Sequence, residues 1–200
     1  MSAARQTRPE ETAILLVDVQ TSFVEAMAGS PEPVLLRLER LLGLAAMIGL
    51  PVIATRERPI AAKGGLHPRV ASPSHAILDK STFDAMAEPG IAASVTALGR
   101  EHVVVAGCET DVCVLLTVLG LLRAGHRVTV LTDCLFSSEP DPSAAVRRME
   151  AAGAAPGTFK TLAYELTATV DRSTWPDGWR ERLAADPSLF PEPETLPPLA

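Results

Sequence analysis

Cysteine is scarce in this 200-residue chain, which holds only three, Cys108, Cys113 and Cys134. No two of them form a Cys-x-x-C pair, and residues 1–13 contain no apolar stretch of the kind that precedes a signal cleavage site. An odd, sparse set of thiols without a secretion signal is typical of reduced cysteines in a cytosol. We therefore expect a cytoplasmic protein without disulfide bonds.

Long basic runs and long apolar runs are absent as well. The chain has 18 Lys and Arg against 24 Asp and Glu, a net charge of −6, whereas nucleic-acid binding needs a basic face. The most apolar run, residues 112–122, stops at Arg123 and is shorter than the roughly 20 residues that span a bilayer. We therefore expect neither nucleic acid nor a membrane as a partner.

Short apolar runs instead alternate with segments of helical periodicity, in a chain that is 47% hydrophobic and 21% charged. The expected strands are 13–17, 51–55, 76–78, 102–106, 127–132 and 158–161. The expected helices are 34–48, 91–98, 111–124, 143–152 and 164–170. Strands that alternate with helices form right-handed parallel units. We predict a three-layer α/β/α, Rossmann-like fold with a central parallel sheet of about six strands.

The end of the chain differs from the rest in composition. Residues 171–200 hold six prolines, both tryptophans and no clear periodicity. We therefore predict one domain over 1–170 and a Pro-rich extension over 171–200. This extension either packs against the domain or a neighbouring subunit, or stays loose.

Three reactive side chains fall where expected strands end. Asp18 follows the first strand, Lys80 follows a short strand, and Cys113 lies just past HVVVAG at the start of a helix. In open α/β sheets, ligands bind outside the carboxyl ends of the strands. We therefore expect these three side chains to meet at one edge of the sheet.

Cys113 is the most informative of the three. If Asp111 caps the helix, Cys113 lies in its first turn, where the helix dipole favours a thiolate and backbone N–H groups are available to an oxyanion. Taken singly, Cys113 could equally be a small buried residue, Asp18 a polar strand end and Lys80 a surface charge. Together they supply a nucleophile, a proton acceptor and a balancing ammonium.

Other candidates have weaker support. His102 and His126 each begin a strand, at the end of the sheet opposite Cys113, so we do not expect a Cys–His pair. Arg56 and Arg58 leave the second strand toward the reactive edge, where they either bind an anionic substrate or are solvated. Cys108 and Cys134 are expected to pack as small apolar residues.

Three segments resemble the isochorismatase-like hydrolases. AILLVDVQTSF is similar to the family's first strand with D-x-Q-x-x-F, LDKSTFDAM to its K-x-x-[FY] segment, and VVVAGCETDVCVLLTVLGLLRAGHRVTVLTDC to its longest signature. SAAVRRMEAAGA is similar to the penultimate helix, so the resemblance covers roughly residues 12–170. The matching positions are Asp18, Gln20, Phe23, Lys80, Phe83, Gly107, Thr110, Cys113, Val114, Gly125 and Asp133.

The resemblance implies a catalytic triad of Asp18, Lys80 and Cys113. It also implies a cis peptide at Cys108–Glu109, with the N–H groups of Glu109 and Cys113 forming an oxyanion hole. Gln20, Phe23, Phe83 and Glu109 are expected to bind the substrate. Members of the family are commonly homo-oligomers, which we expect here too.

Two departures from family patterns narrow the function. Metal-binding members carry Asp-x-His after the second strand, but here TRERP follows, and His67 and His75 lack partners at ligand spacing. We therefore expect no metal and no cofactor. Members that cleave a vinyl ether typically lack the cysteine, so Cys113 favours attack on an acyl carbon.

We predict hydrolysis of a small amide through a thioester on Cys113. One alternative is hydrolysis of a non-amide small molecule. The other is a catalytically silent protein that acts as an interaction module through its extension. The sequence leaves the substrate itself open.

Overall fold

The computed structural model describes residues 6–71 and 76–190. Six strands form one sheet in the order β3-β2-β1-β4-β5-β6, and every neighbouring pair is parallel. This confirms the predicted α/β fold with a parallel six-stranded sheet. The strands are β1 Thr12–Val17, β2 Val52–Glu57, β3 Ala76–Lys80, β4 His102–Gly107, β5 Arg127–Leu135 and β6 Ala155–Gly157.

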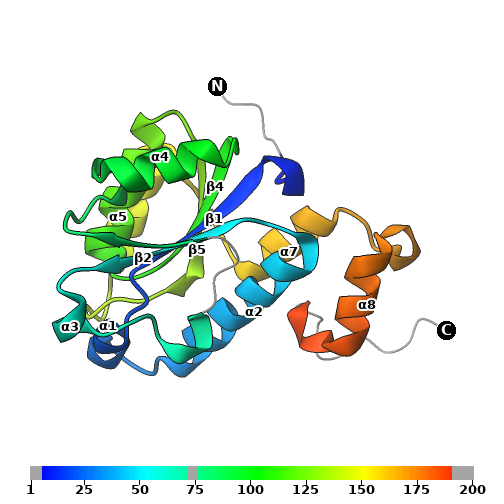
Figure 1. The fold of residues 1–200 in the computed structure, drawn as a ribbon, viewed down its shortest axis with the longest axis horizontal. Helices are drawn as coiled ribbons and strands as arrows, with labels where there is room; N and C mark the ends of the chain where they lie inside the picture. Colours follow the sequence, from blue (N-terminus) through cyan, green and yellow to red (C-terminus); the bar gives the residue numbers. More distant parts are fainter. Residues whose placement is uncertain (1–5, 72–75, 191–200) are drawn as a thin grey trace.

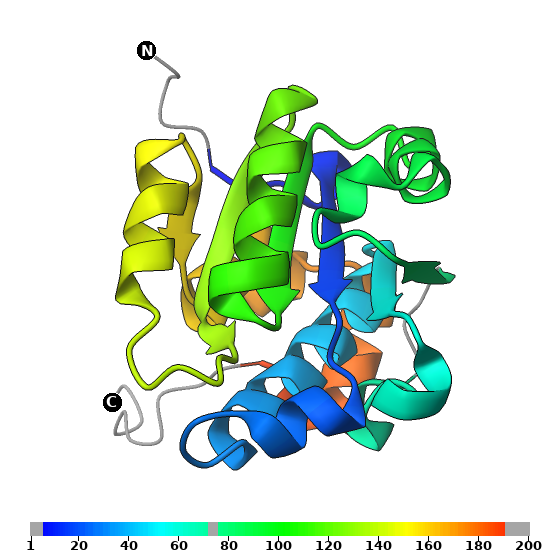
Figure 2. The ribbon, with the colours of Figure 1, turned by 90° about the vertical axis from the view of Figure 1, so that its left-hand side faces the viewer.

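Helices cover both faces of the sheet, so the molecule has three layers, with the sheet in the middle (Figure 2). Helices α4, α5 and α6 pack on one apolar cluster, and α2 and α7 pack on the other. The α-helices are α1 Thr21–Ala26, α2 Glu32–Ile48, α3 Ile60–Lys63, α4 Pro89–Ala97, α5 Leu115–Arg123, α6 Ser143–Ala151, α7 Phe159–Thr167 and α8 Asp177–Ala185. Among the described residues, no helix is long and apolar enough to cross a membrane.

The central strands are apolar throughout because they are covered on both sides. In β1, Ile14 and Leu16 face the cluster under α2, while Leu15 and Val17 face the cluster under α5. Successive side chains of a strand point to opposite faces, so a continuous apolar run fills two cores. The same alternation in β4 places this pair of strands between the two apolar clusters.

The last strand and helix lie closer to the N-terminus than the sequence predicts. The expected strand at 158–161 is wrong, because β6 occupies Ala155–Gly157 and α7 already begins at Phe159. The Thr158 side chain accepts a hydrogen bond from the Thr161 N–H, as a helix N-cap does. Residues 159–161, whose composition suggested a strand, therefore form the first turn of a capped helix.

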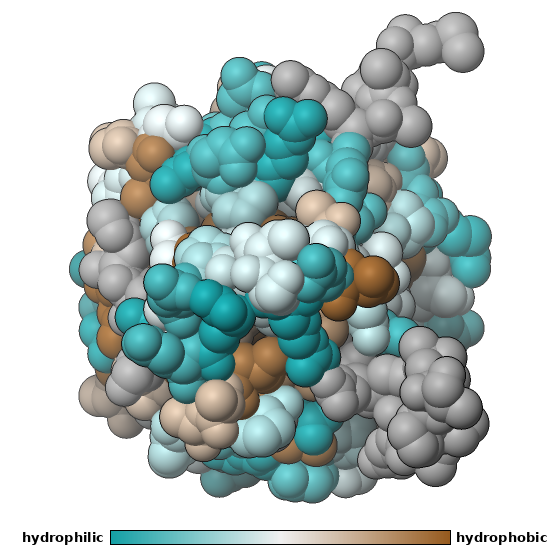
Figure 3. All heavy atoms as spheres, turned by 90° about the vertical axis from the view of Figure 1, so that its right-hand side faces the viewer, coloured by the Kyte–Doolittle hydropathy of each residue, from teal (hydrophilic) through white to brown (hydrophobic). Residues whose placement is uncertain are grey.

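The extension beyond residue 170 contains structure that its sequence does not predict. It forms α8, which contacts α2 and lies to its right in Figure 1. Trp175, Leu183 and Phe190 are buried and join the apolar cluster under α2. The described part of the extension therefore packs against its own domain. Figure 3 looks onto this side of the molecule, where the apolar surface is divided into small separate areas.

Candidate active site

The ends of β1, β3 and β4 bring the predicted residues to a single edge of the sheet. Asp18 directly follows β1, Lys80 ends β3, and Cys113 lies in the helical turn after β4. Asp18 and Lys80 are fully buried, and Cys113 is 3% exposed. The carboxyl ends of parallel strands meet at one edge, which explains how residues far apart in sequence become neighbours.

The predicted residues are in direct contact. The Lys80 Nζ lies 2.6 Å from Asp18 Oδ2 and 3.4 Å from Cys113 Sγ. The Thr55 hydroxyl donates to Asp18 Oδ1 over 2.7 Å, so both carboxylate oxygens are held. A buried ammonium thus joins a carboxylate to a thiol.

A second carboxylate, Glu57, completes the cluster. The Cys113 thiol donates to Glu57 Oε2 at 3.1 Å, and Lys80 Nζ donates to the same oxygen at 3.3 Å. Lys63 Nζ forms an ion pair with the other oxygen, Oε1. Glu57 itself is 8% exposed. Four ionised groups and one thiol therefore share this site.

Sequence reasoning missed Glu57 because it ended the second strand at Thr55. In the structure β2 continues for two more residues and pairs with β3 as far as Lys80. The signal was present, since residues two apart in a strand point to the same face. Placing Thr55 toward Asp18 also places Glu57 toward it.

The side chains of Asp18, Glu57 and Cys113 offer atoms that all lie within 4.8 Å of one another, an arrangement that could hold a metal ion. Lys80 Nζ contacts all three of them, so the ammonium supplies the positive charge in their midst. A metal ion would have to displace it. Among the two histidines considered as ligands, His67 Nδ1 accepts from the Arg69 N–H, and His75 lies outside the described residues.

The electrostatics favour a neutral thiol in the resting site. Burial, followed by the Asp18 carboxylate, raises the pKa of Cys113 and outweighs the opposing charge of Lys80. Burial also raises the pKa of Asp18, against the charge of Lys80. Burial works against a charged Lys80, but the charges of Asp18, Cys113 and Glu57 raise its pKa overall. The favourable effect of the helix N-terminus on a Cys113 thiolate is therefore opposed by burial and by the Asp18 carboxylate.

The turn that carries Cys113 also differs from prediction. Residues 110–114 form a π-helix, and α5 begins only at Leu115. Asp111 does not cap it, because its carboxylate accepts from the Ser137 hydroxyl at 2.7 Å. π-Turns often occur at functional sites, and here the wider turn carries the nucleophile candidate. The preceding Cys108–Glu109 peptide bond is cis.

The residues predicted to bind substrate have different surroundings. Gln20 is buried, and its amide bonds to backbone: Oε1 accepts from the Glu57 N–H at 2.6 Å, and Nε2 donates to the Gly64 carbonyl at 2.8 Å. Phe23 lies under Lys63, with 5.5 Å from Nζ to the ring centre. Phe83 is 55% exposed. The Glu109 carboxylate accepts from the Ser138 hydroxyl.

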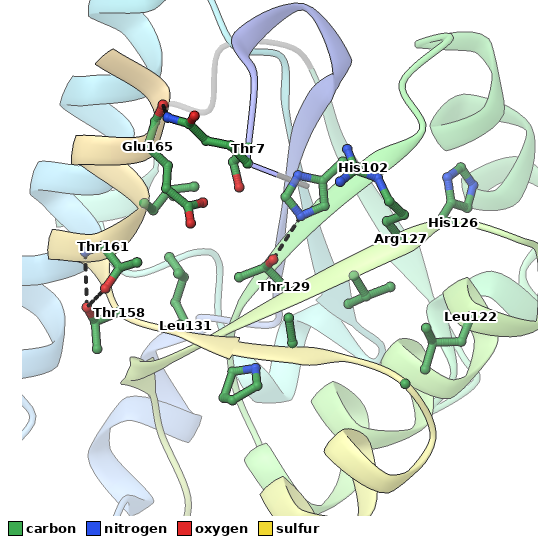
Figure 4. A pocket seen from close by; sticks show the side chains of 17 residues that line it. Thr7, His102, Leu122, His126, Arg127, Thr129, Leu131, Thr158, Thr161 and Glu165 are labelled. Atoms are coloured by element: carbon green, nitrogen blue, oxygen red, sulfur yellow. Dashed lines mark hydrogen bonds between the residues drawn. The ribbon is translucent and has the colours of Figure 1, made fainter. Parts of the chain in front are cut away.

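The remaining predicted candidates lie apart from the thiol. His102 begins β4 and bonds to Thr12 and Thr129 at the opposite end of the sheet. A cavity of about 600 Å³ opens there, where His102, His126 and Arg127 come from the starts of β4 and β5 (Figure 4). Arg56 forms an ion pair with Asp79. Cys108 and Cys134 are buried, as predicted.

A parallel sheet whose edge joins a buried carboxylate, lysine and cysteine is the arrangement that the resemblance to isochorismatase-like hydrolases implies. The sequence matches the isochorismatase domain family over residues 12–161. The chain belongs to this family.

Curated relatives and solved structures agree with that membership. The isochorismatase domain-containing protein 2A of Mus musculus is 28% identical over 172 residues, which cover 83% of this chain and 82% of that protein. The streptothricin hydrolase of Streptomyces noursei is 33% identical over 132 residues, or 60% of this chain and 48% of the hydrolase.

Two solved structures have closely similar folds. YcaC from Pseudomonas aeruginosa, solved with hexane-2,5-diol and covalent acrylamide, has a TM-score of 0.82 and 26% identity, covering 94% of this chain and 96% of that one. The Escherichia coli YcaC gene product, described as an octameric hydrolase of unknown specificity, has a TM-score of 0.83 and 24% identity, covering 94% and 95%.

Proposed function

We propose that this member of the isochorismatase family hydrolyses a C–N bond of a small amide through a covalent thioester on Cys113. The observation that carries the proposal is the buried contact of one thiol with a carboxylate cluster and an ammonium. The thiol supplies a nucleophile, the carboxylates accept protons, and the ammonium balances the negative charge that develops. These are the components of acyl transfer.

The proposed reaction has two stages. Cys113 Sγ attacks the acyl carbon while its proton passes to Asp18, and Asp18 then returns that proton to the departing amine. Water next attacks the thioester, releases the acid and restores the thiol. The N–H groups of Glu109 and Cys113 are the proposed oxyanion donors in both stages.

The electrostatics agree with this order of events. Because burial and Asp18 raise the pKa of Cys113, an isolated thiolate is disfavoured at rest. If the thiol proton passes to Asp18 during the attack, no thiolate has to exist beside the Asp18 carboxylate. Asp18 becomes neutral as the negative charge develops on the substrate oxygen. Lys80 stays charged throughout and holds Asp18 in place.

The comparisons support hydrolysis and a reactive nucleophile. One relative is named for hydrolysing streptothricin. One similar structure carries covalent acrylamide, a reagent that adds to nucleophiles through its β-carbon and leaves its amide intact. Both are properties of those proteins. We propose that Phe23, Phe83 and Glu109 contact the substrate here, while Gln20 acts by fixing the backbone at Glu57 and Gly64.

The wider setting is also a proposal. We infer a cytoplasmic enzyme that acts on a small molecule, without nucleic acid, membrane, metal or cofactor, and that assembles as a homo-oligomer, for which the octameric YcaC is the precedent. The balanced charges within the site, with Lys80 and Lys63 facing Asp18 and Glu57, leave these lysines already paired. This arrangement favours a neutral or cationic substrate over an anionic one.

The deciding experiment is intact-mass spectrometry after mixing with a panel of small amides. The proposal expects an acyl adduct on the wild-type chain that the Cys113→Ala variant does not form. If Cys113 alkylates readily but no amide leaves an adduct, the non-amide hydrolase alternative replaces the amidase. If Cys113 does not react even with small alkylating reagents, the interaction-module alternative is the better account.

A further inference from the structure

Glu57 has a place in the site that the three predicted residues do not explain. Its Oε2 is the oxygen that accepts the hydrogen bond of the Cys113 thiol. Asp18 is held by the Thr55 hydroxyl and by Lys80, and it also lies within hydrogen-bond reach of Cys113. The thiol is therefore placed between two carboxylates, and Glu57 is the one that accepts its hydrogen bond in the resting geometry.

Lys63 lies outside the cluster and stabilises the charged form of Glu57. It forms an ion pair with Glu57 Oε1, while Lys80 bonds to Oε2. Burial works against a charged Glu57, but its bonds to Lys63 and Cys113 and the charge of Lys80 lower its pKa overall. Glu57 is therefore an anion at neutral pH, at a position where it opposes a second anion on Cys113.

The segment that carries this pair is anchored at both ends. Gln20 bonds to the Glu57 backbone and to the Gly64 carbonyl, and the Ser22 hydroxyl donates to the Lys63 carbonyl. Helix α3 lies between these anchors. Helix α1 thus fixes the geometry of the Glu57–Lys63 pair, which is not the behaviour of an unconstrained surface ion pair.

We propose that Glu57, held by Lys63, is a positioning residue for the nucleophile: it holds the Cys113 thiol through its hydrogen bond and, with Lys63, sets how readily that thiol loses its proton. The inference deepens the proposed function, on which it rests. The charged groups that face Cys113 are Asp18, Glu57 and Lys80, with Lys63 acting through Glu57.

The two members of the pair make opposite predictions. Glu57→Gln keeps an oxygen that can accept the thiol hydrogen bond but removes a negative charge 3.1 Å from Sγ. A charge at this range shifts a pKa by about 1–3 units, so Cys113 should alkylate about tenfold faster or more at neutral pH. Lys63→Met removes a positive charge and leaves Glu57 unbalanced, so alkylation should be slower by about threefold or more.

The test is the rate of Cys113 alkylation by iodoacetamide against pH, followed by mass spectrometry in the full-length protein. The rate profile should move to lower pH for Glu57→Gln and to higher pH for Lys63→Met. Arg56→Met and Asp79→Asn are matched controls, because that ion pair joins the same two strands. Both controls should stay within about twofold of wild type.

Opposite shifts support the inference, whereas shifts in the same direction show a loosened site and overturn it. An unchanged pH profile for Glu57→Gln also overturns the inference. An unchanged pH profile for Lys63→Met overturns the part that assigns a role to Lys63. Unfolding would expose Cys108 and Cys134 together with Cys113, so their protection is the folding control. If Glu57→Gln does not fold, Glu57→Asp keeps the charge and withdraws it from Sγ, and should accelerate alkylation less than tenfold but measurably. The readout needs no substrate, so it stands apart from failure of the amide proposal.

Discussion

At the scale of single residues, the site shows that a buried charge needs partners of opposite charge. Lys80 is fully buried, yet its ammonium is matched by Asp18, Glu57 and the thiol. Removing one partner from such a cluster leaves an uncompensated charge, which is strongly unfavourable. Variants at these positions therefore need a readout that separates chemistry from folding.

Asp18 and Lys80 should respond differently when Cys113 is the probe. Lys80→Ala should slow Cys113 alkylation, because the positive charge beside Sγ is lost. Asp18→Asn should abolish turnover yet leave alkylation intact or raise it, because a repelling carboxylate is lost. Alkylation kinetics and amide turnover, measured on the same preparations, check both. Parallel losses in the two assays for Asp18→Asn would contradict the role of Asp18 as proton acceptor.

Metal independence is a second prediction at this scale. Because the Lys80 ammonium lies among the three groups that could bind a cation, activity should survive exhaustive chelation. The measurement is turnover before and after prolonged dialysis against a strong chelator. Activity that disappears and returns with zinc or iron would show that a metal displaces the ammonium.

At the scale of elements, the buried strands and the long helix could be predicted, but element ends could not. β1, β4 and α2 stand out because continuous apolar runs or a regular apolar stripe determine them. The end of β2 depends on pairing with β3, a tertiary contact that local sequence does not show. The sequence therefore does not predict Glu57 as a site residue, whereas the motifs around Asp18, Lys80 and Cys113 predict those three directly.

Gly107, where β4 ends beside β1, should tolerate no side chain. Its φ is +119°, and a Cβ there would lie 2.1 Å from the Val17 carbonyl oxygen. Gly107→Ala should therefore destabilise the fold severely, by about 4 kcal/mol or more. Denaturant unfolding measures this. Gly125→Ala is the matched control, because Gly125 also has a positive φ but nothing lies near its Cβ. A similar loss in both variants would show that backbone strain, and not the contact with β1, is the cause.

His102 should make stability depend on pH through the hydrogen bonds that join β1, β4 and β5. Burial, helped by Arg127, lowers the pKa of His102 from 6.5 to about 4. Between about pH 4 and 6.5, His102 binds more protons in the unfolded chain, so its contribution to stability rises with pH in this window and is constant above it. The free energy of unfolding should change by roughly 2–4 kcal/mol across it. Denaturant titrations of wild type and His102→Gln check this, and an equal pH slope in both would exclude His102 as the source.

At the scale of the whole molecule, residues 171–190 of the extension contribute side chains to the core. Trp175, Leu183 and Phe190 join the apolar cluster under α2, which the proline-rich composition of the extension does not reveal. Composition reports the average character of a segment, whereas three well-placed apolar side chains decide where it packs.

Deleting residues from Asp171 onward should therefore lower the unfolding midpoint. Each lost apolar side chain removes about 1.5–3 kcal/mol of burial, less the entropy regained by the released segment. Thermal unfolding measures the loss. Sedimentation of the same variant tests the second role of the extension, since smaller species would indicate that it also contacts a neighbouring subunit. An unchanged profile with reduced stability would confine it to its own domain.

The near-complete burial of Cys113 has a kinetic consequence. In the second stage of the proposed reaction, water must reach the thioester carbon, which lies in the same enclosed site and is partly covered by the acyl group. Hydrolysis of the thioester would then be slower than transfer of the acyl group to sulfur. The first turnover would be a rapid burst of amine, and the steady state that follows would consist mostly of acylated enzyme.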